Sequence, residues 1–62
     1  MNLSERMILY RAKERISQRE LAARCGCSLQ TINSVENGLQ KPSKLTISKI
    51  ELVVGKGGNN ND

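Results

Sequence analysis

The chain contains no histidine, tryptophan or phenylalanine, and its one aromatic residue is Tyr10. Without histidine, its two cysteines cannot form a zinc-binding set of Cys and His residues. General acid–base catalysis also lacks its commonest side chain, and the six acidic residues are scattered along the chain. The scarcity of aromatic residues argues against single-stranded nucleic acid, which proteins usually bind by base stacking. The sequence therefore predicts no catalytic, metal or cofactor site.

Other features that are absent narrow the class of protein further. The 62 residues allow one small domain. No apolar run approaches the length needed to span a membrane, and no signal-peptide pattern is visible. Cys25 and Cys27 are too close in sequence for an ordinary disulfide, so we interpret both as small apolar core residues. This use of cysteine predicts a reducing, cytoplasmic location.

The charge balance is basic, with ten Lys and Arg residues against six acidic ones, a net charge of +4 and a pI near 9.5. All five arginines precede residue 25. A basic surface attracts polyanions such as nucleic acid by releasing counterions. Charges of this kind also serve merely as solubilising groups, and the charge alone does not separate the two interpretations.

The most informative stretch runs from residue 17 to residue 38 and reads as two short helices joined by a tight turn. Ser17 and Glu20 have the spacing of a capping box, in which each side chain bonds the backbone amide of the other residue. Gly26 stands where the chain must reverse and a positive φ is needed. Ser28 is the expected N-cap of the second helix, and Gly38 the expected left-handed residue after it.

The second helix of this pair has two unlike faces. At about 100° per residue, Ile32 and Val35 fall together on a stripe that we expect to be buried. The opposite face carries amides and a hydroxyl but no charge: Gln30, Asn33, Ser34 and Asn37. A helix that only needs solvation usually carries Lys and Glu there. Side-chain amides offer a donor and an acceptor in one plane, which suits paired hydrogen bonds to base edges in the major groove.

Two further helices are predicted on either side of this stretch. The first spans 3–14, with Leu3, Met7 and Tyr10 inward and Arg6, Lys13 and Glu14 outward. The last begins after Pro42 and the N-cap Ser43, spans about 44–54 and ends at Gly55. Its expected buried face consists of Ile47, Ile50 and Val54.

Taken together, these features resemble the Cro and phage-repressor (Xre-type) helix-turn-helix family. The matching positions are Gln18, Ala22, Gly26, Ile32 and Val35, followed by Glu36-Asn37-Gly38 and Pro42-Ser43. The resemblance covers about residues 3–55 and implies an all-α, lambda-repressor-like bundle of four helices as a single domain over 1–55. The family commonly adds a fifth helix, which is lacking here: residues 56–62 form a polar sequence that we expect to be a disordered tail.

The resemblance implies a sequence-specific regulator of transcription, acting as a repressor, that binds a double-stranded, palindromic DNA operator. Expected base-reading residues are Leu29, Gln30, Asn33 and Ser34, with Leu29 either packing on a thymine methyl or lying at the core boundary. Expected phosphate contacts are Gln18, Ser28, Thr31, Asn37 and Lys41, together with Arg11 if Glu36 does not fully engage it. The family also pairs an arginine and an acid at the positions of Arg11 and Glu36; two independent surface charges are the alternative. A different function for the same scaffold is a protein-interaction module or antirepressor.

The last helix also predicts an interface. Leu45 and Leu52 lie one heptad apart and opposite the expected core face, and Val53 adds to this exposed side. We expect a homodimer built on this helix, with a two-fold axis that sets two recognition helices about 34 Å apart. In the alternative, the leucines pack on the loop 39–41 of their own chain and the protein pairs only on DNA.

Overall fold

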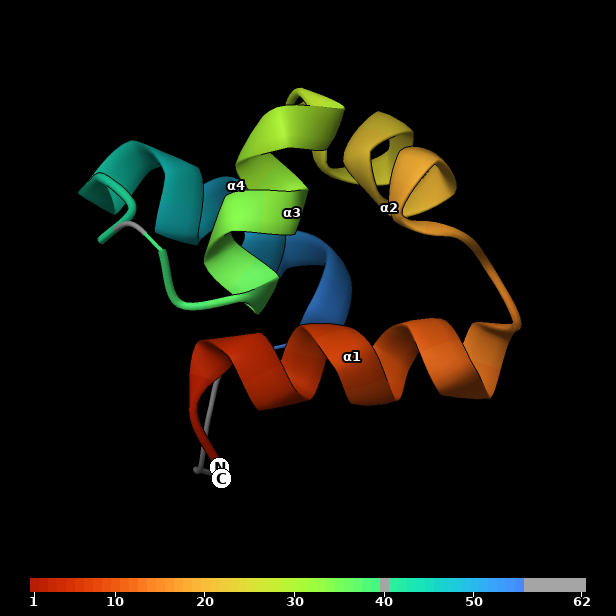
Figure 1. Ribbon diagram of the computed structural model, residues 1–62. Coiled ribbons are helices and arrows are strands. Elements are labelled where there is room, and N and C mark those ends of the chain that lie inside the picture. Colours follow the sequence, from red (N-terminus) through yellow and green to blue (C-terminus); the bar gives the residue numbers. More distant parts are fainter. Residues whose placement is uncertain (40, 56–62) are drawn as a thin grey trace.

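The computed structural model describes residues 1–39 and 41–55, which form four α-helices and, over these residues, no strand. The helices are α1 (Leu3–Glu14), α2 (Gln18–Cys25), α3 (Leu29–Glu36) and α4 (Lys44–Val54) (Figure 1). These bounds confirm the predicted all-α, four-helix fold. The polar tail, and with it the missing fifth helix, lies outside the described residues.

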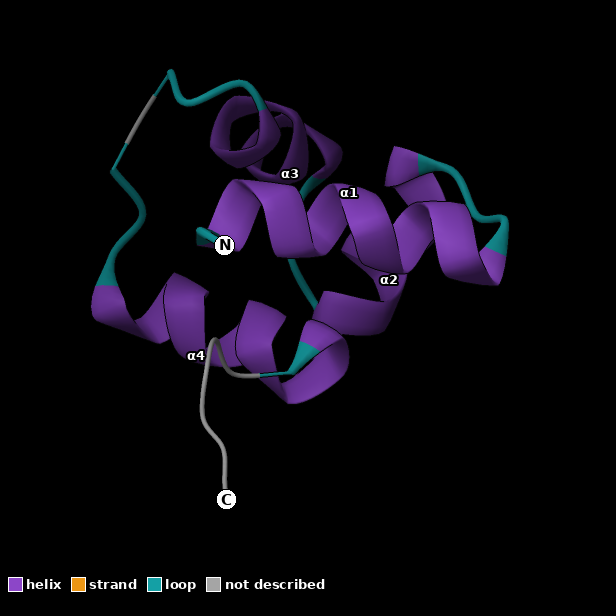
Figure 2. Ribbon diagram, turned by 90° about the horizontal axis from the view of Figure 1, so that it is seen from below, coloured by secondary structure: helices purple, strands orange, loops and turns teal. Residues whose placement is uncertain are grey.

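α1 and α2 each pack against both of the other two helices. α1 contacts α3 and α4, and α2 contacts the same two helices. α1 therefore lies along one side of the bundle, below α3 in Figure 1 and in front of α3 in Figure 2. α2 and α3 form the helix-turn-helix pair on the other side.

Each helix begins after a polar residue whose side chain accepts a hydrogen bond from a backbone amide of the first turn: Asn2, Ser17, Ser28 and Ser43. The reciprocal capping box predicted for Ser17 and Glu20 is only half right. Ser17 does accept from the Glu20 amide, but the Glu20 carboxylate instead bonds Arg24 Nε, one turn further along, at 3.3 Å. A complete capping box is present at Asn2 and Glu5, where none was predicted.

A residue with positive φ follows every helix, and Gly38 after α3, at φ 68°, confirms the left-handed residue predicted there. Gly26 closes α2 at φ 71°, as predicted from the need to reverse the chain. Arg15 closes α1 at φ 57° and ψ 46°, and it is the one non-glycine residue with positive φ in the described part of the chain. An L-residue in this region brings Cβ close to the following carbonyl oxygen, so Arg15 is strained.

The core is small and draws on all four helices. Its buried residues are Met7, Leu21, Ala22, Cys25, Ile32, Val35 and Ile50. Burial raises the pKa of the Cys25 thiol to about 11, so the thiol remains neutral at physiological pH. Cys25 and Cys27 are both free thiols, and Cys27 packs against the same core. These observations confirm the interpretation of the cysteines as apolar fillers.

Two residues lie in different environments from those predicted. Arg6 was expected to point outward, but its side chain is only 16% exposed and lies between α1 and α4. It forms an ion pair with Glu51 at 3.5 Å and donates to the carbonyl oxygen of Gly55. Val53 was expected to be bare, but it is half-buried and packs against the core.

Replacing Arg15 with glycine should stabilise the domain. Arg15→Gly removes the Cβ contact in the left-handed region, and we expect a gain of about 1 kcal/mol, or roughly 4–8 °C in Tm. Thermal and urea unfolding followed by circular dichroism measure the gain. Arg15→Ala is the matched control, because it removes the guanidinium and keeps Cβ. A Gly variant less stable than the Ala variant would show that the left-handed conformation costs less than the additional unfolded-state entropy of glycine.

Candidate nucleic-acid interface

The turn between α2 and α3 is held by local hydrogen bonds. Ser28 Oγ accepts from the Thr31 amide at 3.1 Å and lies 2.8 Å from Thr31 Oγ1. The Cys27 amide donates back to the carbonyl oxygen of Ala22 at 3.0 Å. These bonds set the direction in which α3 leaves the turn. They also engage the hydroxyls of two expected phosphate contacts, Ser28 and Thr31, in capping α3.

α3 divides into the two predicted faces. Ile32 and Val35 are buried in the core, as the helical periodicity indicated. On the other side Gln30, Asn33 and Asn37 are exposed, Ser34 is half-buried and Leu29 is 38% exposed at the boundary. No charged side chain lies on this exposed face. Its amides and hydroxyl are the groups that can form hydrogen bonds to base edges.

Glu36, at the end of α3, binds Arg11 of α1 through two parallel hydrogen bonds. Arg11 Nε lies 2.7 Å from Oε2, and Nη2 lies 2.8 Å from Oε1. The pair implied by the family resemblance is therefore present, and the Glu36 side chain is only 4% exposed. The third nitrogen, Nη1, donates to the carbonyl oxygen of Ile16 at 3.4 Å. All three guanidinium nitrogens thus have partners inside the protein, and Arg11 supports the interface from within. Its side chain is 23% exposed and has five N–H donors, so the expected phosphate contact stays a prediction.

The charge of Glu36 is maintained by its partners. Burial by itself would raise the pKa of the Glu36 carboxyl group, but the hydrogen bonds from Arg11 and Gln18 outweigh burial and bring the pKa below its ordinary value. A second contact ties the same residue to α1, because Ser4 Oγ donates to the Glu36 carbonyl oxygen at 2.6 Å.

A hydrogen-bonded chain leads from this ion pair to the exposed face of α3. Gln18 Nε2 donates to Glu36 Oε1 at 3.0 Å, and Asn33 Nδ2 donates to Gln18 Oε1 at 3.2 Å. A carboxylate can only accept, so Gln18 must turn its NH2 group to Glu36 and its oxygen to Asn33. Asn33 must then use its NH2 group toward Gln18, which leaves its Oδ1 acceptor free. Gln18 and Asn33 were predicted in separate groups and this link was missed, because they are fifteen residues apart on different helices.

Asn37 has a structural contact of its own. Its Nδ2 donates to the Asn33 carbonyl oxygen at 2.9 Å, and the same oxygen also accepts from the Asn37 backbone amide at 3.1 Å. The side chain is nevertheless exposed and retains its amide oxygen and a second N–H.

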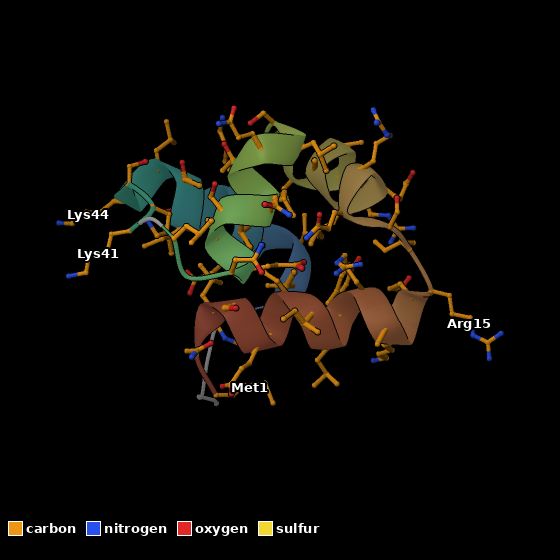
Figure 3. The ribbon with its side chains drawn as sticks, in the orientation of Figure 1. Met1, Arg15, Lys41 and Lys44 are labelled. Atoms are coloured by element: carbon orange, nitrogen blue, oxygen red, sulfur yellow. The ribbon has the colours of Figure 1, made fainter. Side chains whose placement is uncertain are left out.

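Several of the basic side chains are engaged within the protein. Arg6 and Arg11 form the ion pairs already described, and Arg24 contacts Glu14, Glu20 and the Tyr10 hydroxyl. Arg15 and Arg19 are exposed and lie within three residues of Gln18 in the sequence. In Figure 3, Arg15 points outward at one end of the molecule, and Lys41 and Lys44 point outward at the other. Of these four basic residues, only Lys41 was predicted from the sequence as a phosphate contact. A basic sequence carries no signal of which of its charges are paired within the fold.

The expected dimer residues Leu45 and Leu52 are exposed, at 67% and 88%. Leu39 and Lys41 are exposed as well, so the described residues of the loop 39–41 do not cover these leucines. Val53, the third expected interface residue, is half-buried and packs against the core. The large apolar side chains that α4 exposes are Leu45 and Leu52.

Two capped helices joined through a left-handed glycine, with an uncharged amide face on the second, define a helix-turn-helix DNA-binding domain. A comparison with family models agrees, because the Helix-turn-helix model matches residues 7–57. The chain belongs to this Cro/C1-type helix-turn-helix family, a family of DNA-binding regulators. Searches among curated proteins and among solved structures found no match. Among the described helices, none has the length and apolar character required to cross a membrane.

Removing Arg11 should destabilise the domain more than removing the ion pair. Arg11→Met leaves Glu36 as a buried charge held only by Gln18, which we expect to cost about 3 kcal/mol. A domain of this size has a total stability of about 3–9 kcal/mol, so the variant should lose a third of it or more. Arg11→Met with Glu36→Gln should be more stable than the single variant, because no uncompensated charge remains. If urea unfolding at neutral pH shows that the double variant is less stable than the Arg11→Met variant, the prediction is wrong.

The same pair predicts an acid dependence. Because the pKa of Glu36 is lower in the folded protein than in the unfolded chain, its stabilising contribution is present above the unfolded pKa of about 4.3. The contribution is lost as the pH falls through the lower, folded value. In urea unfolding measured across this range, the double variant should lose less stability than the wild type between about pH 5 and the acid limit.

Proposed function

We propose that this protein is a sequence-specific regulator of transcription that binds double-stranded DNA through α3 and acts as a repressor by occupying its operator. The observation that carries the proposal is the exposed face of α3, which bears amides and a hydroxyl but no charge. Amides and a hydroxyl are less strongly hydrated than the charged groups of Lys and Glu. They match the donor and acceptor pattern of the major groove.

Base reading would be shared among four side chains of α3. Gln30 is exposed in the first turn and can form two hydrogen bonds to adenine N6 and N7. Asn33, with its oxygen free, suits an exocyclic amino group on adenine or cytosine. Ser34 lies one turn beyond Gln30 and would contact a neighbouring base, while Leu29 would pack on a thymine methyl group.

Phosphate contacts would lie on both sides of this reading face. At the start of α2, Gln18 retains one free N–H, and the exposed Arg15 and Arg19 add positive charge. Beyond α3, Asn37, Lys41 and Lys44 would contact the other backbone segment. Ser28 and Thr31 would contribute from the α3 N-terminus, where their hydroxyls and the first amides of the helix lie together.

We further propose a homodimer formed through Leu45 and Leu52 of α4. Exposed leucines on one side of a helix favour burial against a like surface. A two-fold axis there would present two α3 helices to successive major grooves, so the operator would be palindromic.

Gln30→Ala tests the assignment of α3 as the reading helix. On the preferred site the variant should bind about 1–3 kcal/mol more weakly, with relaxed specificity at one or two base positions. The preferred site comes from selection out of a random duplex pool, and affinity from fluorescence anisotropy. Lys41→Ala is the matched control: it should weaken all sequences about equally and reduce the salt slope by about one. If Gln30→Ala leaves the ratio of affinities for the selected site and for random duplex DNA unchanged, Gln30 is not a base-reading residue.

Leu52→Lys tests the α4 interface without disturbing the core, since the side chain it replaces is 88% exposed. We expect the variant to lose the α4 contact and to bind a palindromic site with lower affinity, while its affinity for one half-site stays the same. Sedimentation equilibrium and anisotropy with whole and half sites measure the two effects. A variant that binds the whole site as tightly as the wild type would show that α4 is not the interface.

A further inference from the structure

A second apolar surface lies on α1, away from the bundle. Ile8 is 46% exposed and Leu9 is 55% exposed, and both adjoin a shallow hollow lined by Met1, Glu5, Ile8, Leu9 and Ala12. Leu9 also borders a second hollow, toward α4, that includes Lys13 and Val54. Figure 3 shows Met1 pointing away from α3, below α1. We call this the α1 surface; neither DNA reading by α3 nor dimer formation through α4 uses it.

The positions of the charges on this surface have an internal symmetry. Glu5 and Lys13 lie four residues before and after Leu9, so the three side chains form one ridge along α1. A two-fold axis through Leu9 pairs two such helices antiparallel. Glu5 of each copy then faces Lys13 of the other, while the two Leu9 side chains meet at the centre. Like charges stay about 12 Å apart, since eight residues of helix separate them.

Both charges are available for such a contact. Within residues 1–39 and 41–55, Lys13 has no ion pair, and it is exposed. Glu5 uses Oε1 to accept from the Asn2 amide at 3.0 Å, which leaves Oε2 free. The apolar residues between them supply the contact area, and the charges fix the antiparallel direction.

We propose that the α1 surface binds the same surface of a second copy of this chain, antiparallel, with Leu9 at the two-fold axis. One face of a helix about 18 Å long buries less than the roughly 800 Å² per partner of a standard interface, so this contact is weak. It is distinct from the α4 contact. A protein with both contacts links dimers into larger assemblies, which brings neighbouring DNA-bound copies together.

The test uses the full chain carrying Leu52→Lys, so that α4 contributes no association. Sedimentation equilibrium up to several hundred micromolar should show a monomer–dimer equilibrium. Adding Lys13→Glu gives an acidic ridge on every copy, and adding Glu5→Lys instead gives a basic ridge on every copy. Each should raise the dissociation constant about tenfold or more, because like charges then face each other across the axis. An equimolar mixture of these two proteins should regain association, because the acidic ridge of one then faces the basic ridge of the other.

The outcomes separate the two interfaces. If the Leu52→Lys protein remains monomeric at all concentrations, the α1 proposal is wrong, and that result does not affect the proposal of a dimer through α4. Association that persists in both charge variants, or a mixture that does not recover, overturns the antiparallel pairing. Leu9→Lys should also abolish association in the Leu52→Lys background, and thermal unfolding by circular dichroism checks that each variant is folded.

Discussion

The buried carboxylate of Glu36 is the constraint on which the rest of this structure depends. It lies at the end of α3, receives two hydrogen bonds from Arg11 of α1 and one from Gln18 of α2, and so joins three helices at one point. A buried charge is tolerated only where its hydrogen-bonding capacity is filled. The position of α3 relative to α1 and α2 is therefore specified by a polar interaction as well as by apolar packing, whose directionality is weak.

This interaction also determines which chemical groups reach the surface. Because the carboxylate accepts and never donates, the orientations of the Gln18 and Asn33 amides follow from it in turn. An amide that is free to flip offers either a donor or an acceptor to a base. Here one orientation is favoured before any ligand arrives, so less conformational entropy is lost on binding. The stability of the fold and the specificity proposed for the site therefore depend on the same side chains, Glu36, Gln18 and Asn33.

The distribution of charge and apolar surface reflects the small size of the domain. Three of the five arginines are used to hold helices together, which leaves the outer positions, such as Arg15, Lys41 and Lys44, to attract a polyanion. Only seven apolar residues are buried among the described ones, while Ile8, Leu9, Leu45 and Leu52 remain exposed on two separate helices. A domain that buries so little has apolar surface to spare, and association is the ordinary means of covering it.

The sequence by itself determined the helices and the two faces of α3. Caps, glycines and the 3.6-residue period are local signals, so the helix bounds, the reversal at Gly26 and the burial of Ile32 and Val35 could all be predicted. The family resemblance supplied the Arg11–Glu36 pair, which no local pattern indicates. Only the tertiary structure decided which polar side chains are engaged and which are free. It placed Arg6 between α1 and α4, packed Val53 on the core and bonded Gln18 to Asn33. These contacts join residues far apart in the chain, and their existence depends on how the helices cross, a quantity that periodicity along a single helix does not contain.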